Sequence, residues 1–188
     1  MSEKEFKEYG FTKARVRAKG TRGPTRHKLT SFKHITKVPK QVMSEIERII
    51  KLQRCTEEGV DVNEETNYND WRDDTDVSVI KKYLEDNFGE VYRARISVMP
   101  PGHELFWHID TDTSVLCRMQ LAIRAEGSEF QFRNRIEGER SLVMENGNAY
   151  FVNTGWSHRV VNKDNWRVVL IFGIEYNNIP NKEQLHIS

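Results

Sequence analysis

Eight short segments between residues 92 and 176 alternate apolar and polar side chains, and this alternation constrains the fold more than any other feature. A period of two is typical of β-strands with one buried face. Turn signals such as Pro100-Pro101-Gly102 and Asn146-Gly147-Asn148 separate the segments. The predicted strands are Tyr92–Met99, Glu104–Asp110, Leu116–Arg124, Glu129–Arg133, Arg140–Met144, Ala149–Asn153, His158–Asn162 and Trp166–Tyr176. Their number and spacing predict an antiparallel sandwich or barrel of the jelly-roll type, with side chains converging at its mouth.

Two earlier segments repeat apolar residues at spacings of three and four, which is the period of an amphipathic helix. The first segment covers Val38–Arg54, and Pro39 suits its first turn. The second begins after Asp76, which can cap a helix, and ends at Gly89. We therefore expect a mostly β protein with two N-terminal helices packed outside the barrel.

The length of 188 residues suits a single domain with one core. We expect a basic N-terminal arm over residues 1–38, with a short strand at Lys13–Ala18, and helical support over residues 39–90. The core fills residues 91–176, and residues 177–188 form a tail.

Residues 55–75 are acidic and polar and show little periodic apolar content, so we expect a loop there. Residues 57–76 are a candidate lid over the mouth of the barrel. Tyr68 and Trp71 lie in this polar segment and either anchor it to the core or contact a substrate. Anchoring is the favoured interpretation.

Charge is distributed unevenly along the chain. Residues 1–40 hold 12 Lys/Arg and 3 Asp/Glu, a net charge of +9, whereas residues 41–188 carry a net charge of −8. A basic arm indicates an anionic partner such as RNA or a ribosome, and it is equally typical of an arm that folds back onto its own acidic body. The arm contains no RNA-binding motif with interleaved aromatic residues, so both interpretations stay open.

The first residues lack the apolar stretch of a secretory signal, and no apolar run is long enough to span a membrane. Cys55 and Cys117 lie far apart and in no disulfide or zinc motif. We therefore expect a cytoplasmic protein in a reducing compartment, without a membrane partner.

His108 and Asp110 lie one residue apart on the second predicted strand, so alternation directs both side chains to one face, about 7 Å apart along the backbone. That spacing suits two ligands of one metal ion. The other histidines that lie in the arm, at the tail or on the opposite strand face are His27, His34, His103 and His186. His158 is therefore the predicted third ligand. Two imidazoles and one carboxylate form a facial triad, which leaves three positions of an octahedral ion open for oxygen chemistry.

Arg167 directly precedes the apolar run Val168–Phe172, on the predicted strand after His158. A guanidinium that enters so hydrophobic a strand is costly unless it is paired. A cosubstrate with a carboxylate would pair with it in bidentate fashion.

This arrangement resembles the Fe(II)- and 2-oxoglutarate-dependent dioxygenases, whose core is a double-stranded β-helix of jelly-roll, cupin-like form. The resemblance covers roughly residues 91–176, and its core is the ordered set His108-Ile109-Asp110, His158 and Arg167. More narrowly, the chain is similar to the aspartyl/asparaginyl β-hydroxylase and proline hydroxylase branch. The segments that carry this likeness are Arg118-Met119-Gln120, Gly155–Asn162 and Arg167–Leu170.

The resemblance implies that Fe(II) binds to His108, Asp110 and His158. It also implies that 2-oxoglutarate binds to the metal and places its far carboxylate on Arg167, with O2 as the other cosubstrate. Arg118 and Gln120 are implied members of the cosubstrate site, where Arg118 either assists the anchor or binds a substrate carboxylate.

Three features separate this chain from parts of the superfamily. Asparaginyl hydroxylases have Arg-x-His where this chain has Arg118-Met119-Gln120. Mammalian members of that branch lack the carboxylate ligand, so Asp110 makes the chain more similar to bacterial free-amino-acid hydroxylases or to the common pattern of the superfamily. Nucleic-acid demethylases carry a second arginine at the position of Gly173, which disfavours a demethylase.

The implied activity is hydroxylation of an amino acid, free or as a residue in a protein, with release of succinate and CO2. One alternative is the same chemistry on RNA or a ribosome-associated target recruited by the basic arm. The other is a non-catalytic cupin-like metal-binding module, which Arg167 argues against because a structural metal site needs no buried guanidinium. The candidate substrate contacts on the first strand are Tyr92, Arg95, Ser97 and Met99. The tryptophans expected to pack around the barrel are Trp107, Trp156 and Trp166.

Overall fold

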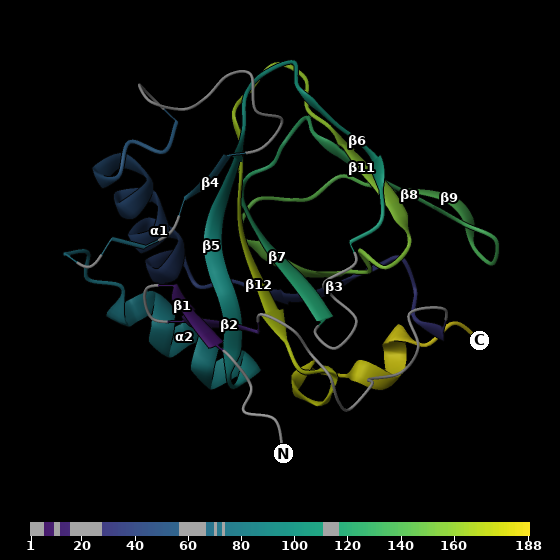
Figure 1. Cartoon of the computed structure of the whole chain (residues 1–188), viewed down its shortest axis with the longest axis horizontal. Coiled ribbons are helices and arrows are strands. Elements are labelled where there is room, and N and C mark those ends of the chain that lie inside the picture. Colours follow the sequence, from purple (N-terminus) through teal and green to yellow (C-terminus); the bar gives the residue numbers. More distant parts are fainter. Residues whose placement is uncertain are drawn as a thin grey trace.

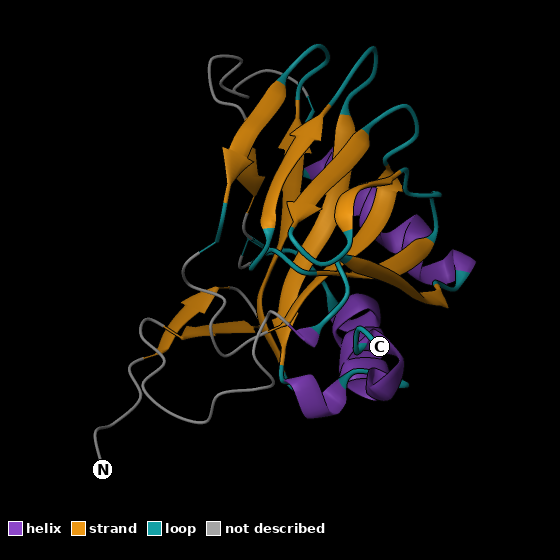
Figure 2. Cartoon of the chain, turned by 90° about the vertical axis from the view of Figure 1, so that its right-hand side faces the viewer, coloured by secondary structure: helices purple, strands orange, loops and turns teal. Residues whose placement is uncertain are grey.

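The structure is a computed structural model that describes residues 6–9, 12–15, 28–56, 67–69, 71–72, 74–110 and 117–188. Two β-sheets face each other, and two helices lie on the outer side of the larger sheet (Figure 1). The turns that join the strands gather at the ends of this sandwich (Figure 2).

All eight predicted strands are present. They are β5 (Val91–Met99), β6 (Glu104–His108), β7 (Cys117–Arg124), β8 (Glu129–Asn134), β9 (Gly138–Leu142), β10 (Asn148–Val152), β11 (Ser157–Val161) and β12 (Arg167–Ile174). The major sheet contains the neighbours β5, β12, β7 and β10, and the minor sheet has the order β6-β11-β8-β9. The chain therefore changes sheet at almost every connection, which confirms the jelly-roll prediction.

The strand boundaries differ from the prediction by one or two residues, and two of these differences affect the interpretation. β6 ends at His108, so Asp110 lies beyond the strand instead of on it. β9 begins at Gly138, because Asn134 already pairs with Gly138 across a tight turn. The prediction that His108 and Asp110 lie on one face of the same strand is therefore wrong, and another structural feature must bring the two side chains together.

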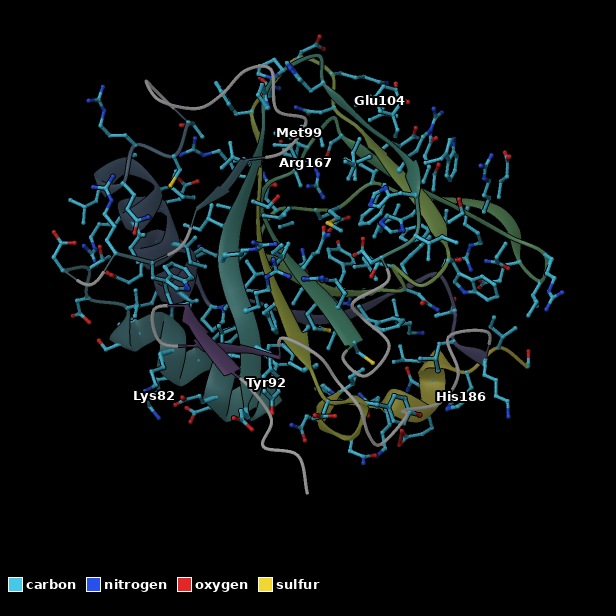
Figure 3. The ribbon with its side chains drawn as sticks, in the orientation of Figure 1. Lys82, Tyr92, Met99, Glu104, Arg167 and His186 are labelled. Atoms are coloured by element: carbon cyan, nitrogen blue, oxygen red, sulfur yellow. The ribbon has the colours of Figure 1, made fainter. Side chains whose placement is uncertain are left out.

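The strand β12 is buried along its whole length because both of its faces are covered. Val168, Leu170 and Phe172 pack in the core between the major sheet and the helices. Val169 and Ile171 pack in the second core, between the sheets. Arg167 has the same parity as Val169 and Ile171, so its side chain enters the space between the sheets (Figure 3).

The helices α1 (Lys40–Leu52) and α2 (Ser78–Phe88) supply the outer layer and confirm the two predicted helices. α1 follows Pro39 and buries its face Val42, Ile46, Ile49 and Ile50. Val77 occupies the cap position of α2, and Asp76, one residue earlier, accepts a hydrogen bond from the Ser78 amide at 2.9 Å. Gly89 ends α2 with a φ of +66°, a conformation that glycine adopts at little cost.

Further strands extend the major sheet. β3 (Phe32–Lys37) pairs with β10 inside the predicted arm, where no strand was expected. β1 (Phe6–Tyr9) and β2 (Thr12–Arg15) form a hairpin, and β2 overlaps the predicted strand Lys13–Ala18, whose remainder lies outside the described residues. β4 (Asn67–Asn69) pairs with β5. The division of the chain into one domain with an arm and a tail stays a prediction.

The C-terminal segment contains two short 3-10 helices, η2 (Tyr176–Asn178) and η3 (Lys182–Leu185). Immediately after η3 it pairs with residues 28–30: the Thr30 amide donates to the Leu185 carbonyl at 2.7 Å, and the Ile187 amide to the Lys28 carbonyl at 2.9 Å. The two ends of the described core are therefore joined to each other.

The predicted acidic lid falls mainly on residues 57–66, which lie outside the described part of the chain. Trp71 confirms the anchoring interpretation: it is 5 % exposed, and its indole donates a hydrogen bond to the Ala94 carbonyl at 2.7 Å. The side chain of Tyr68 lies outside the described residues.

Within the described ranges, no helix has both the length and the apolar character that crossing a membrane requires.

Candidate metal centre

The three predicted ligands converge between the sheets. His108 ends β6, His158 lies on β11, and the two residues are directly paired across these neighbouring strands. Asp110 follows β6, and one of its carboxylate oxygens, Oδ1, lies 3.4 Å from His108 Nε2 and 4.0 Å from His158 Nε2. One ligand atom from each residue lies within 4.8 Å of the others, so a single ion can contact all three after small side-chain rotations.

Backbone carbonyls fix the orientation of both imidazole rings. His108 Nδ1 lies 2.7 Å from the Phe106 carbonyl oxygen, and His158 Nδ1 lies 2.9 Å from the Trp156 carbonyl oxygen. A carbonyl oxygen only accepts, so each Nδ1 carries the proton and donates it. Each Nε2 then presents its lone pair to the site, which is the arrangement that a metal-binding histidine needs.

His158 is buried, with 2 % of its surface exposed. This burial lowers the pKa of its imidazole from 6.5 to about 4, and it outweighs the hydrogen bond to Trp156 and the charge of Asp110, which act in the opposite direction. The ring is therefore neutral at physiological pH. Neutral imidazole is the form that binds a metal ion.

Asp110 is held from outside β6. Its backbone amide donates to the Thr154 carbonyl at 2.9 Å, which fixes the residue beside His158. Its second carboxylate oxygen, Oδ2, lies 3.7 Å from a guanidinium nitrogen of Arg118. One oxygen of Asp110 therefore faces the histidines and the other faces a cation.

Arg167 lies on the floor of the same site and is 5 % exposed. One of its guanidinium nitrogens donates a hydrogen bond to Gln120 Oε1 at 2.9 Å. This amide oxygen satisfies a donor without adding a negative charge. The structure thus places Gln120 beside Arg167 and Arg118 beside Asp110, so the two residues of the Arg-x-Gln motif serve different parts of the site.

A pocket of about 510 Å³, including its opening to solvent, joins these residues. Its polar lining includes all six predicted site residues together with Arg95, Ser97 and Thr154. Leu105, Phe130 and Val160 form an apolar wall opposite.

The candidate substrate residues on β5 separate into two groups. Arg95, Ser97 and Met99 line the pocket. Tyr92 lies toward the other end of β5 (Figure 3), where its hydroxyl donates to Glu90 at 2.6 Å.

The tryptophans follow the packing expectation in different ways. Trp156 is buried, and Trp166 packs against the core on the helix side. Trp107 is half-buried, with the guanidinium groups of Arg133 and Arg159 lying 4.3 and 5.1 Å from its ring centre.

Sequence reasoning missed the role of Thr154. Its contribution is a backbone carbonyl, which no residue type reveals. Its position four residues before His158, at the start of the turn that leads into β11, is the one signal in the sequence.

Comparison with known families decides the class of protein. Residues 74–176, just over half of the chain and all of the site described above, match the family described as aspartyl/asparaginyl beta-hydroxylase. The chain belongs to the aspartyl/asparaginyl β-hydroxylase family. It is accordingly an oxygenase of the Fe(II)- and 2-oxoglutarate-dependent class, as the resemblance implied. The alternative of a non-catalytic metal-binding module is thereby set aside.

Solved structures show the same fold as this β-hydroxylase family member at low sequence identity. A prolyl-4-hydroxylase from Pseudomonas putida aligns over 77 % of this chain and 92 % of its own, with 11 % identity and a TM-score of 0.56. AviO1 from Streptomyces viridochromogenes aligns over 82 % and 94 %, with 12 % identity and a TM-score of 0.53. The collagen prolyl hydroxylase of Paramecium bursaria Chlorella virus-1 aligns over 78 % and 96 %, with 13 % identity and a TM-score of 0.50. No curated protein sequence matches the chain significantly.

The residues of the site fit the cofactors of this family. Two imidazole nitrogens and one carboxylate oxygen suit Fe(II), and the buried guanidinium on the pocket floor suits the far carboxylate of 2-oxoglutarate.

Proposed function

We propose that the protein hydroxylates an amino acid, free or as a residue in a protein, and converts 2-oxoglutarate and O2 to succinate and CO2 in the same cycle. His108, Asp110 and His158 hold Fe(II). The observation that carries the proposal is the convergence of two lone-pair nitrogens and a carboxylate oxygen on a pocket whose floor is Arg167. When bound, the iron supplies the oxidising chemistry that inserts oxygen into a C–H bond.

Arg167 anchors the far carboxylate of 2-oxoglutarate. It is long enough to enter the pocket from β12 while its backbone stays within the most buried strand of the sheet. Gln120 holds the guanidinium through its amide oxygen, and the planar fork of Arg167 has the geometry that binds a carboxylate in bidentate fashion. This support lets Arg167 receive the cosubstrate with little loss of conformational freedom.

Arg118 has a different role from Arg167. Because it contacts Asp110 Oδ2, it stabilises the charged carboxylate and turns Oδ1 toward the histidines. It also lines the pocket, so the same guanidinium can receive a substrate carboxylate at the metal side.

The lining of the pocket favours a substrate with an anionic group. Arg95, Arg118 and Arg167 face one carboxylate, Asp110, among the described residues that line it. When 2-oxoglutarate is bound at Arg167, the positive charges of Arg95 on β5 and Arg118 on β7 favour a second carboxylate in the pocket. Arg95 and Ser97 on β5 are the proposed substrate contacts, and the apolar wall keeps water away from the reacting atoms.

The anionic partner of the basic segment stays a prediction. The basic segment 1–40, proposed to contact RNA or a ribosome, is described at residues 6–9, 12–15 and 28–40, and none of these described residues favours that partner. Cys55 and Cys117 are free thiols in the structure. The cytoplasmic location stays a prediction as well.

Succinate release tests the proposed function. The protein is incubated with Fe(II), 2-oxoglutarate and O2, and succinate is measured with free amino acids, with their carboxamides and with peptides. We expect one amino acid or peptide to raise succinate release and to gain 16 mass units. Release that no amino acid, free or in a peptide, can raise would contradict the proposed substrate class.

A further inference from the structure

The short connection between β10 and β11, residues 153–156, serves two of the three metal ligands at once. The Thr154 carbonyl accepts a hydrogen bond from the Asp110 amide at 2.9 Å. The Trp156 carbonyl accepts one from His158 Nδ1, also at 2.9 Å. Asp110 and His158 therefore take their orientation from a single four-residue loop.

This loop is tied in turn to one backbone oxygen. The side-chain amide of Asn153 and the indole N–H of Trp156 both donate to the Leu29 carbonyl, each at 3.1 Å. Asn153 also closes the loop, because its side-chain oxygen accepts a hydrogen bond from the Gly155 amide at 3.3 Å. All the groups that meet at Leu29 are buried, so water cannot replace a lost bond at low cost.

The Leu29 carbonyl is itself held from two sides. On one side, the residues next to it pair with the C-terminal segment, through Leu185 and Ile187. On the other, the Glu137 carboxylate accepts hydrogen bonds from the amide and hydroxyl of Ser31, at 2.7 and 2.6 Å. The Ser31 carbonyl also accepts a hydrogen bond from the backbone amide of Asn153 at 2.8 Å. Residues 28–31 are thus a fixed point against which the loop is set.

We propose that Asn153 and Trp156 are positioning residues for the metal centre. By fastening the loop 153–156 to the Leu29 carbonyl, they hold the two carbonyl oxygens that aim Asp110 and His158. The inference rests on the proposed function in that the three ligands bind Fe(II). It gives the segment 28–31 and the C-terminal pairing a part in metal binding, although neither lies in the pocket.

The expected effect follows from the type of contact. Groups that orient metal ligands typically contribute a factor of about 10 to 100 in metal affinity. Removing the indole N–H of Trp156 or the side-chain amide of Asn153 leaves the ligands in the chain but loosens the loop 153–156, whose carbonyls orient Asp110 and His158. Metal affinity should therefore fall more than the stability of the fold.

Trp156→Phe and Asn153→Ala test the proposal. Trp156→Phe keeps a buried aromatic ring and removes only the donor to Leu29 and part of the ring volume. Trp166→Phe is the matched control, because it makes the same chemical change at a tryptophan that packs on the helix side of the sheet. Co(II) is titrated into each metal-free protein, with its visible absorption as the readout, and the melting temperature of each metal-free protein is measured in parallel.

We expect Co(II) to bind about 10-fold or more weakly to Trp156→Phe and to Asn153→Ala, with an altered visible spectrum. Trp166→Phe should keep the affinity and spectrum of the unchanged protein, even where its melting temperature falls. The double variant Asn153→Ala/Trp156→Phe should lose less than the product of the two single effects, because both bonds end on one oxygen.

The outcomes distinguish a failure of the proposed metal centre from a failure of the proposed positioning role. If the unchanged protein fails to bind Co(II), the proposed metal centre itself is wrong. If the unchanged protein binds it and both single variants bind within two-fold of Trp166→Phe, the positioning role is overturned while the metal centre stands. Should Asn153→Ala fail to fold, Trp156→Phe decides alone.

Discussion

The rim of the pocket, formed by the proposed ligands His108, Asp110 and His158, and its floor, formed by Arg167 and Gln120, are built in different ways. At the rim, His108 and Asp110 keep 37 % and 25 % of their side-chain surface exposed, Asp110 lies outside any strand, and only His158 is buried. On the floor, Arg167 and Gln120 are buried on adjacent central strands of the major sheet. The rim is aimed by backbone carbonyls of β6 and of the connection between β10 and β11, whereas the floor is fixed by strand register. The site therefore combines a partly exposed proposed metal centre with a buried proposed anchor for the cosubstrate.

Removing a ligand at the rim should have the largest effect. His158→Ala is expected to weaken Co(II) binding by more than about 100-fold, beyond the loss typical of an orienting partner, because it deletes a donor atom. The control His103→Ala removes a histidine that hydrogen-bonds to the Pro101 carbonyl instead. Titration by visible absorption measures both. Tight Co(II) binding to His158→Ala would assign the ion to other ligands.

Changing the floor should separate the cosubstrate from the metal. Arg167→Met is expected to weaken 2-oxoglutarate binding by about 100-fold while Co(II) affinity stays the same, because a buried charge-assisted pair is lost. Arg124→Met is the matched control: Arg124 pairs with Glu47 on α1, outside the pocket. Anaerobic titration of the metal-loaded protein provides the measurement. Equal losses in both variants would contradict the anchor.

The pH dependence of stability should report the buried histidine at the rim. The folded-state pKa of His158 is about 4 and the unfolded value about 6.5, so the unfolded chain binds more protons between these pH values. The free energy of unfolding is therefore highest above about pH 6.5 and falls as the pH drops toward 4, by on the order of 3 kcal/mol. Urea unfolding of the metal-free protein across this range measures the effect. His158→Ala should have a shallower pH dependence, and an unchanged slope would show that another group is responsible.

The smallest effect is expected where one neutral hydrogen bond supports the floor. Gln120→Leu removes the acceptor of Arg167 and should weaken 2-oxoglutarate binding about 5-fold, which corresponds to about 1 kcal/mol. Met119→Leu, on the opposite face of β7, is the control, since it keeps an apolar side chain in the helix-side core. If Gln120→Leu binds 2-oxoglutarate as the unchanged protein does, strand register alone holds the anchor.

The features that could be predicted from the sequence are those determined by residues that are neighbours in the chain. Period-two alternation is written residue by residue, so all eight strands of the core could be found. The same holds for Arg167, because a charge beside an apolar run is visible without knowing the fold. β3 was not predicted, because Phe32–Lys37 fell within the expected basic arm and its strand depends on pairing with β10, far along the chain.

The site was predicted with one faulty step. His108 and Asp110 were expected to share a strand face, but β6 ends at His108, and the Thr154 carbonyl is what brings Asp110 back beside His158. The pairing of Arg167 with Gln120 is likewise set by the register between β12 and β7. Contacts of this kind join residues that are 44 or more positions apart, and a single sequence holds no record of them.

The pairing of residues 28–30 with Leu185 and Ile187 has a consequence for the order of events during synthesis. The three proposed metal ligands all leave the ribosome before residue 185 does. The brace behind the loop 153–156, however, closes only when that later segment has emerged and folded back. A nascent chain therefore carries the proposed metal ligands before the hydrogen bonds that brace their loop have formed.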